Sequence, residues 1–158
     1  MSERVLVFGS NSFSGAAFVD YCLSEGLEVV AVSRSEEPSD IFLPYKGKPG
    51  VEFYQMDLNK DLHEIVDLTF SLKPDYFVNF AAQSMVAQSW ENPGHWFQTN
   101  TLSNVLLHDE LRKMEFLKKY VHVSTPEVYG SCSGHVSTEQ VMNPSTPYAV
   151  SRAAADRS

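Results

Sequence analysis

The sequence contains little cysteine and no arrangement of side chains typical of a metal site. Only two of its 158 residues are cysteines, Cys22 and Cys132. They are too few and too far apart to predict a disulfide framework or a metal-binding knuckle. The five histidines show no His-x-x-x-His spacing, which disfavours metal binding. We therefore expect free thiols and no bound metal.

Long apolar runs and an excess of basic residues are also lacking. The longest apolar stretches, such as residues 29–32, have the length of a strand and predict no membrane span. The first residues lead directly into the strand-like run 5–8, which leaves no room for a targeting segment and favours a cytoplasmic protein. Lysine and arginine total 12 against 20 acidic residues, a net charge of −8. This balance disfavours binding to nucleic acid or to anionic membranes.

Strand-like and helical patterns alternate along the chain. Near-continuous apolar or β-branched runs are typical of strands buried on both faces, and helical spacing separates them, for example at Leu102, Val105 and Leu106. The alternation predicts an α/β fold, a doubly wound parallel sheet in one dinucleotide-binding domain over residues 1–158, with ligands at the carboxyl ends of the strands. The expected strands are Val5–Gly9, Glu28–Ser33, Val51–Gln55, Tyr76–Phe80 and Tyr120–Ser124.

Two segments rich in proline, glycine or serine predict long loops, at residues 34–50 and 131–147. A further helix is expected to begin near Tyr148. No internal repeat or low-complexity tract interrupts this organisation.

A glycine-containing turn joins the first predicted strand to the first predicted helix. This setting is typical of a dinucleotide site, because helix-start amides can bind a diphosphate while glycines permit the tight turn and close packing. Ser12 stands where a middle glycine is often found, and its amide is expected to remain available. A ligand-free turn is the alternative. The predicted cofactor-binding residues here are Gly9, Asn11, Ser12, Phe13, Ser14 and Gly15.

The residues after the second predicted strand bear on the choice of cofactor. Many folds of this type place an acidic residue there to bind the adenosine ribose, but this chain reads Ser33-Arg34-Ser35. Arg34 favours a 2′-phosphate and hence NADP. The alternative is that Arg34 is only a solvated loop residue and that Glu36 or Glu37 binds the ribose of NAD.

Several motifs in order resemble the extended short-chain dehydrogenase/reductases. They are Asp57-Leu58, Asn79-Phe80-Ala81-Ala82-Gln83-Ser84, Phe97-Gln98-Thr99-Asn100, Ser124-Thr125-Pro126-Glu127-Val128-Tyr129-Gly130, and Thr138-Glu139 to Asn143-Pro144-Ser145-Thr146-Pro147-Tyr148. The last three look most like the nucleotide-sugar 4,6-dehydratases, including those acting on dTDP-glucose and GDP-mannose. The resemblance covers the whole chain but only about the N-terminal half of such an enzyme, so the C-terminal substrate domain is expected to be absent.

The resemblance implies roles for residues beyond the glycine turn. Asp57 and Leu58 would border the adenine, and Ser84 would face the sugar nucleotide. The remaining implied cofactor-binding residues are Ala81, Ala82, Gln83, Asn100, Tyr148 and Arg152. For the two alanines, close packing at a strand end is the alternative.

The resemblance also implies a catalytic set. Tyr148 would take the proton of the sugar C4 hydroxyl, and Thr125 would hydrogen-bond the C4 oxygen. Glu127 would remove the C5 hydrogen, a step that a simple epimerase lacks. Arg152 stands where the family has lysine, and it cannot join a proton relay because guanidinium does not lose its proton. Pro126 stands where dTDP-glucose dehydratases have an aspartic acid, although GDP-mannose dehydratases also lack that acid.

Three functional hypotheses follow. The first is an NADP- or NAD-dependent nucleotide-sugar 4,6-dehydratase whose isolated 158 residues are inactive. The second is a nucleotide-sugar 4-epimerase or reductase, and the third is a cofactor-binding module without catalysis. Taken singly, Glu127 could be a surface carboxylate, Tyr148 an aromatic at a helix start and Thr125 a turn hydroxyl. Apolar surface at an exposed sheet edge favours a homo-oligomer.

Overall fold

The computed structural model describes residues 2–158 and consists of two compact units. Unit 1 comprises Met1–Ala81 and Asp109–Val123, and unit 2 comprises Ala82–His108 and Ser124–Ser158. The assignment of residues 1–158 to one dinucleotide-binding domain stays a prediction.

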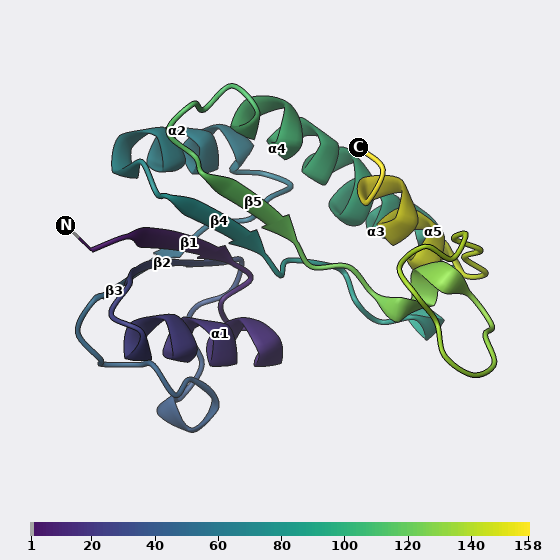
Figure 1. Cartoon of the computed structure of the whole chain (residues 1–158), viewed down its shortest axis with the longest axis horizontal. Helices are drawn as coiled ribbons and strands as arrows, with labels where there is room; N and C mark the ends of the chain where they lie inside the picture. The colour runs from purple at the N-terminus through teal and green to yellow at the C-terminus, as the bar shows by residue number, and fades with distance from the viewer. Residues whose placement is uncertain (1) are drawn as a thin grey trace. The chain divides into compact units, whose positions relative to one another are not determined.

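Unit 1 is built on a five-stranded parallel sheet with the strand order β3-β2-β1-β4-β5. The central strand β1 pairs with β2 through Val7 and Ala31, and with β4 through Val7 and Val78. The sheet lies between α1 on one face and α2 on the other (Figure 1). The predicted doubly wound parallel sheet is therefore confirmed. The strands are β1 Arg4–Phe8, β2 Glu28–Ser33, β3 Val51–Gln55, β4 Tyr76–Asn79 and β5 Lys119–His122.

Burial explains which strands the sequence identifies most clearly. The three central strands are almost wholly buried after their first residue, whereas β3 and β5 have a neighbour on one side only and are half exposed. β1, β4 and β5 end one or two residues before the predicted ends at Gly9, Phe80 and Ser124. Gly9 leaves the strand because it turns at φ +85°, a conformation that glycine adopts without steric cost.

The first helix covers one face of the sheet. α1 (Phe13–Ser24) buries Ala16, Val19 and Cys22 against side chains of β1 and β2. The predicted loop 34–50 is more ordered than expected, because it contains the 3-10 helix η1 (Asp40–Phe42) and completes this core with buried Leu43 and Tyr45. On the other face lies α2 (Leu62–Leu72).

Unit 2 is made of short helices and irregular chain. Its helices are η2 (Ala87–Trp90), α3 (Pro93–Trp96), the π-helix η3 (Phe97–Leu102), η4 (Pro126–Tyr129) and α5 (Pro147–Ala155). The chain passes from unit 2 to unit 1 within α4 (Ser103–Leu111). The predicted loop 131–147 has no regular element before α5, which begins one residue earlier than expected. Within residues 2–158, no helix combines the length and the apolar character needed to cross a membrane.

Candidate functional site

Two glycines let the turn after β1 approach other backbone closely. A Cβ on Gly9 would lie 2.7 Å from the Ala81 amide nitrogen, and a Cβ on Gly15 would lie 2.2 Å from the Gly9 carbonyl oxygen. Both distances are shorter than any ordinary contact, so neither position has room for a side chain. The turn and the end of β4 are thus held together at the carboxyl edge of the sheet.

Ser12 closes the turn and caps the first helix. Its hydroxyl donates to Gly9 O at 2.7 Å and accepts from Gly15 N at 3.0 Å, which is the usual pattern of a serine N-cap. The Ser12 amide donates to Gly9 O at 3.0 Å, so the expectation that this amide stays available to a ligand is wrong.

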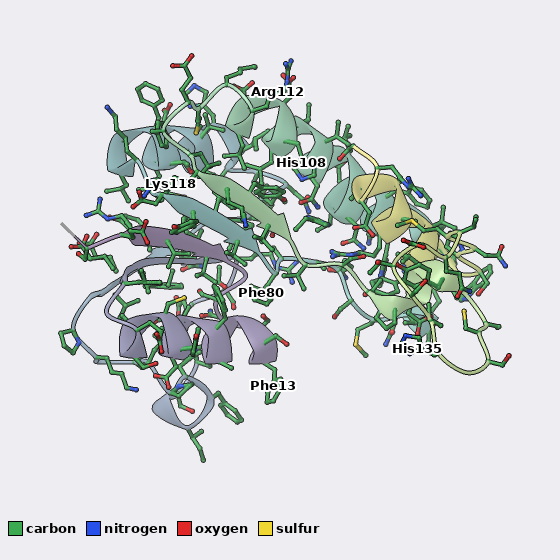
Figure 2. All side chains as sticks on the ribbon, viewed as in Figure 1. Phe13, Phe80, His108, Arg112, Lys118 and His135 are labelled. Atoms are coloured by element: carbon green, nitrogen blue, oxygen red, sulfur yellow. The ribbon has the colours of Figure 1, made fainter. Side chains whose placement is uncertain are left out.

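The next two amides form the open end of α1. Within residues 2–158, the amides of Phe13 and Ser14 donate no hydrogen bond, as expected for the first turn of a helix. Both residues are exposed, and the Phe13 ring, 94% exposed, points away from the sheet (Figure 2). Open amides at a helix start attract an anion, so the turn fits a diphosphate.

Polar contacts tie this turn to the end of β2. The Asn11 amide donates to Ser33 Oγ at 2.9 Å, and Ser33 Oγ also lies 3.3 Å from Ser10 Oγ. The Asn11 side chain donates to the carbonyl oxygens of Ser35 at 3.0 Å and Glu36 at 2.9 Å. Ser33, at the end of the strand after which many such folds place an acidic residue, is buried and bonded to the glycine turn.

Arg34 projects from the end of β2 into solvent. Its carbonyl oxygen accepts from Gln55 Nε2 at 3.1 Å. Within the described part of the chain, its guanidinium forms no hydrogen bond or ion pair, and the residue is exposed. An exposed guanidinium without such contacts is available to a phosphate group.

The remaining predicted residues of unit 1 follow β3 and β4. Asp57 is half buried and its carboxylate accepts from the Asn59 amide at 2.9 Å, while Leu58 is buried. The Ala81 amide donates to Asn79 Oδ1 at 2.9 Å. Because parallel strands place their carboxyl ends at one edge, the structure brings the glycine turn, Arg34, Asp57 and Ala81 to the same edge of the sheet.

In unit 2, α5 carries the predicted Tyr148 and Arg152 pair. Pro147 begins the helix, and the Thr146 hydroxyl accepts from Ala149 N at 3.0 Å as its N-cap. Tyr148 is 8% exposed and Arg152 is 2% exposed. Four residues of separation place both side chains on one face of the helix.

The turn that carries Glu127 contacts α5. Thr125 caps η4 by accepting from the Glu127 amide at 3.4 Å, and Pro126 occupies the first helical position. η4 contacts α5, and Glu127 is exposed. The structure thus places the predicted Thr125, Glu127, Tyr148 and Arg152 on two adjoining elements of one unit.

Asn100 lies at the centre of a buried hydrogen-bond network. Its Oδ1 accepts from Gln83 N at 2.8 Å, and its Nδ2 donates to Gln83 O and to Ser151 Oγ, both at 3.0 Å. Asn100 is fully buried and links the segment at Gln83 to Ser151 of α5. Its direct contact with cofactor stays a prediction. Ser84 is exposed and Ala82 is half buried in the adjoining segment.

Sequence reasoning missed two polar contacts in unit 2. Ser89 accepts a hydrogen bond from the Tyr148 amide at 3.2 Å, and Ser124 donates to the Asp156 carboxylate. Single serines and an aspartate carry no spacing signal, so only the fold reveals these contacts.

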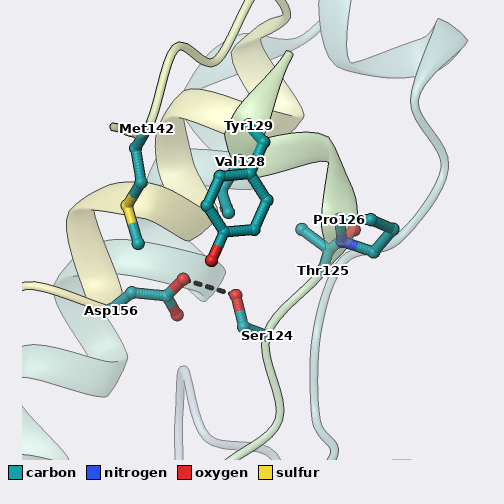
Figure 3. A pocket seen from close by; sticks show the side chains of 7 residues that line it. All are labelled: Ser124, Thr125, Pro126, Val128, Tyr129, Met142 and Asp156. Atoms are coloured by element: carbon teal, nitrogen blue, oxygen red, sulfur yellow. Dashed lines mark hydrogen bonds between the residues drawn. The ribbon is translucent and has the colours of Figure 1, made fainter. Parts of the chain in front are cut away.

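Ser124, Tyr129 and Asp156 point toward one another in a cavity of about 370 Å³ (Figure 3). This cavity is also lined by Thr125, Pro126, Val128 and Met142.

In the part of the chain that the structure describes, no group of three or more His, Cys, Asp and Glu side chains is placed to hold a metal ion. Both thiols are free, and burial raises the pKa of the Cys22 thiol to about 11.

The sequence matches the family described as GDP-mannose 4,6 dehydratase over residues 6–158. A protein described as a probable dTDP-glucose 4,6-dehydratase from Sinorhizobium fredii is 31% identical over 165 residues, covering 97% of this chain. The alignment covers 47% of that relative. The chain therefore spans about half the length of the curated relatives it matches.

Solved structures support the same likeness. A dTDP-glucose 4,6-dehydratase from Streptomyces venezuelae, with NAD bound, has a TM-score of 0.85 and 29% identity, and the match covers 98% of this chain and 49% of that protein. A UDP-glucose 4-epimerase from Thermus thermophilus, in complex with NAD, has a TM-score of 0.84 and 28% identity, with 98% and 49% covered.

Proposed function

Because the chain belongs to the GDP-mannose 4,6 dehydratase family of extended short-chain dehydrogenase/reductases, we propose that it carries the cofactor site and catalytic residues of a nucleotide-sugar 4,6-dehydratase. The observation that carries this proposal is the contact of η4 with α5, which places Glu127 and Thr125 on the element beside Tyr148. Glu127 matters most, since the removal of a C5 hydrogen distinguishes dehydration from simple epimerisation.

The cofactor is a nicotinamide dinucleotide, with NADP favoured over NAD. The open amides of Phe13 and Ser14 would bind its diphosphate, and Asp57 and Leu58 would border its adenine. The exposed Arg34 guanidinium would bind a 2′-phosphate. Glu36 or Glu37 would bind the ribose if NAD is used. Two of the solved relatives have NAD bound.

The residues of unit 2 would perform the proton transfers. When bound, the nicotinamide would supply hydride transfer from and to the sugar. Tyr148 would take the proton of the C4 hydroxyl, while Thr125 polarises the C4 oxygen. The resulting ketone acidifies the C5 hydrogen, Glu127 would remove it, and water would leave from C6.

Two residues depart from the family pattern. Pro126 has no proton to donate, so Glu127 or water would have to protonate the departing C6 hydroxyl. Arg152 would supply a fixed positive charge on the same helix face as Tyr148 but would not relay a proton. The change at Arg152 bears on whether the chain is active, and the change at Pro126 bears on the choice of substrate.

Two alternatives are kept. A nucleotide-sugar 4-epimerase or reductase needs Tyr148 and Thr125 but not Glu127, and the likeness to the Thermus thermophilus epimerase favours it. A cofactor-binding module without catalysis is favoured by Arg152. A polypeptide of these 158 residues spans about half of its relatives, so by itself we expect it to bind cofactor and to turn over no nucleotide sugar.

We also propose self-association. Leu102, Val105 and Leu106, which have helical spacing in the sequence, are 49%, 37% and 46% exposed. If these aliphatic side chains form one patch, it is a candidate interaction surface. A second copy of the chain would cover them, and a monodisperse monomer in sedimentation would contradict this.

The cofactor assignment is tested by titrating NADP and NAD into wild type and Arg34→Ala. Loss of a charge-assisted contact to phosphate should weaken NADP binding about tenfold to a hundredfold and leave NAD nearly unchanged. Arg157→Ala, which removes an exposed arginine of unit 2, is the control. Unchanged NADP affinity in Arg34→Ala would refute the phosphate-binding role.

The reaction assignment is tested by product analysis with GDP-mannose, dTDP-glucose and UDP-glucose. A 4-keto-6-deoxy sugar supports the dehydratase, and a C4 epimer supports the epimerase. Cofactor binding without turnover is the result expected of the 158 residues alone, and dehydration by them would contradict that expectation.

A further inference from the structure

Tyr148 is held through both polar groups of its own backbone. Its N–H donates to Ser89 Oγ at 3.2 Å, and its carbonyl oxygen accepts from Ser151 Oγ at 2.7 Å. Both serines are fully buried. Water therefore cannot substitute for either hydroxyl without a change in the packing around α5.

The two serines belong to one hydrogen-bond network, which the backbone of residues 83–89 closes into a ring. Ser151 Oγ accepts from Asn100 Nδ2, and the Asn100 side chain is bonded to both the amide and the carbonyl group of Gln83. Gln83 and Ser89 are the two ends of one segment, residues 83–89. Each end of this segment is thus linked to one backbone group of Tyr148, through Asn100 and Ser151 at one end and directly at the other.

Ser89 is oriented for this task. Its hydroxyl proton is used in a bond to Val86 O at 2.6 Å, which leaves the oxygen lone pairs to accept the Tyr148 amide. The remaining amides at the start of α5 are satisfied locally, since Thr146 accepts from both Ala149 and Val150. The contact from Ser89 therefore ties the first turn of α5 to a distant part of the sequence.

We propose that Ser89 is a positioning residue for Tyr148. By accepting the Tyr148 amide, it fixes the first turn of α5 and hence the direction in which the phenol leaves the helix. The inference rests on the proposed function, in which that phenol takes a proton from the substrate. Its structural content does not depend on that step and can be measured separately.

The test compares Ser89→Ala with wild type by NMR in the 158-residue chain. We expect hydrogen exchange of the Tyr148 amide to accelerate about tenfold, because the amide loses its acceptor. The ring signals of Tyr148, assigned with carbon-13-labelled tyrosine and the Tyr148→Phe spectrum, should shift and broaden. Ser89→Thr keeps a hydroxyl and should restore both readouts.

A matched control separates positioning from general stability. Thr69→Val removes an equally buried hydroxyl, which donates to Ile65 O at 2.7 Å within α2. It should lower the free energy of unfolding without changing the Tyr148 ring signals. If Ser89→Ala leaves those signals unchanged, or if Thr69→Val shifts them equally, the proposal is overturned.

Ser89→Cys keeps the proposal testable if Ser89→Ala does not fold. If Ser89→Ala does not fold, the same measurements on Ser89→Cys decide, since a thiol is a weak acceptor and should give a partial shift of the ring signals. An unshifted ring in folded Ser89→Cys would then reject the proposal. Failure of wild type to bind NADP or NAD would refute the proposed function and leave the Ser89 result standing.

Discussion

At the scale of single residues, two helix starts differ in what they offer to a ligand. The amides of Phe13 and Ser14 at the start of α1 have no acceptor in residues 2–158. The amides of Tyr148 and Ala149 at the start of α5 are occupied by hydroxyls of the protein. Because anions bind open helix-start amides, only the start of α1 is suited to a diphosphate.

Gly15→Ala tests the close packing of this turn. The new Cβ would meet Gly9 O at 2.2 Å and Ser12 Oγ at 2.8 Å, so the turn must shift. We expect the free energy of unfolding to fall by about 1–3 kcal/mol and cofactor binding to weaken, as measured by urea denaturation and calorimetric titration. Gly94→Ala, where the added Cβ meets nothing within 4 Å, is the control. Equal stability of the two variants would contradict the packing argument.

Residue patterns within one segment were predictable, and contacts between distant segments were not. Gly9 and Gly15 follow from their setting between a strand and a helix, and Tyr148 and Arg152 follow from their spacing and the resemblance. Ser89 contacts Tyr148 across 59 positions of sequence. No local pattern encodes such a pair, because tertiary packing alone decides which serine meets an amide.

At the scale of elements, continuous apolar runs identify buried strands better than they identify strand ends. β1, β2 and β4 are buried on both faces, so their sequences admit no alternating pattern. Their ends depend on turn geometry, as at Gly9. The segment 34–50 was predicted as a loop because of its prolines, and the burial of Leu43 and Tyr45 could not be seen there because isolated apolar residues have no periodicity.

Thr146→Ala tests how much the cap stabilises α5. Removing the hydroxyl leaves the Ala149 amide without its acceptor, and loss of a threonine N-cap costs about 1 kcal/mol. We expect a decrease of this size in urea denaturation, compared with Ser133→Ala at an exposed loop position. A decrease no larger than that of Ser133→Ala would show that the cap does not stabilise the helix.

At the scale of the whole molecule, a network of charges joins the amino ends of the strands in unit 1. Lys118 pairs with Glu3 at 2.7 Å and Asp75 at 2.9 Å, and Arg4 pairs with Glu28 at 2.7 Å. The Lys118 ammonium lowers the pKa of Glu3, and the hydrogen bond from the Arg4 amide lowers the pKa of Asp75. Hydrogen bonds from Ser2 and Arg4 lower the pKa of Glu28. Hydrogen bonds to Glu3 and Asp75 raise the pKa of Lys118.

These pKa shifts fix the sign of the pH dependence. The carboxylates have depressed pKa values in the folded state, so their contribution is present above the unfolded values of about 4 and is lost as pH falls below them. Lys118 has a raised pKa, so its contribution is lost only as pH rises beyond about 10.4. Urea denaturation between pH 2.5 and 7 (roughly the range over which these groups protonate) should show stability falling toward acid. The slope should flatten in Lys118→Met, and an unchanged slope would argue against the network.

The same strands separate this network from the ligand edge. β1 runs from Arg4 to Phe8, a span of about 13 Å. The network and the glycine turn are therefore farther apart than the distance over which salt screens exposed charges, about 8 Å. Protein engineers can therefore redesign the amino edge for thermal stability independently of the carboxyl edge, where we propose that a coenzyme binds.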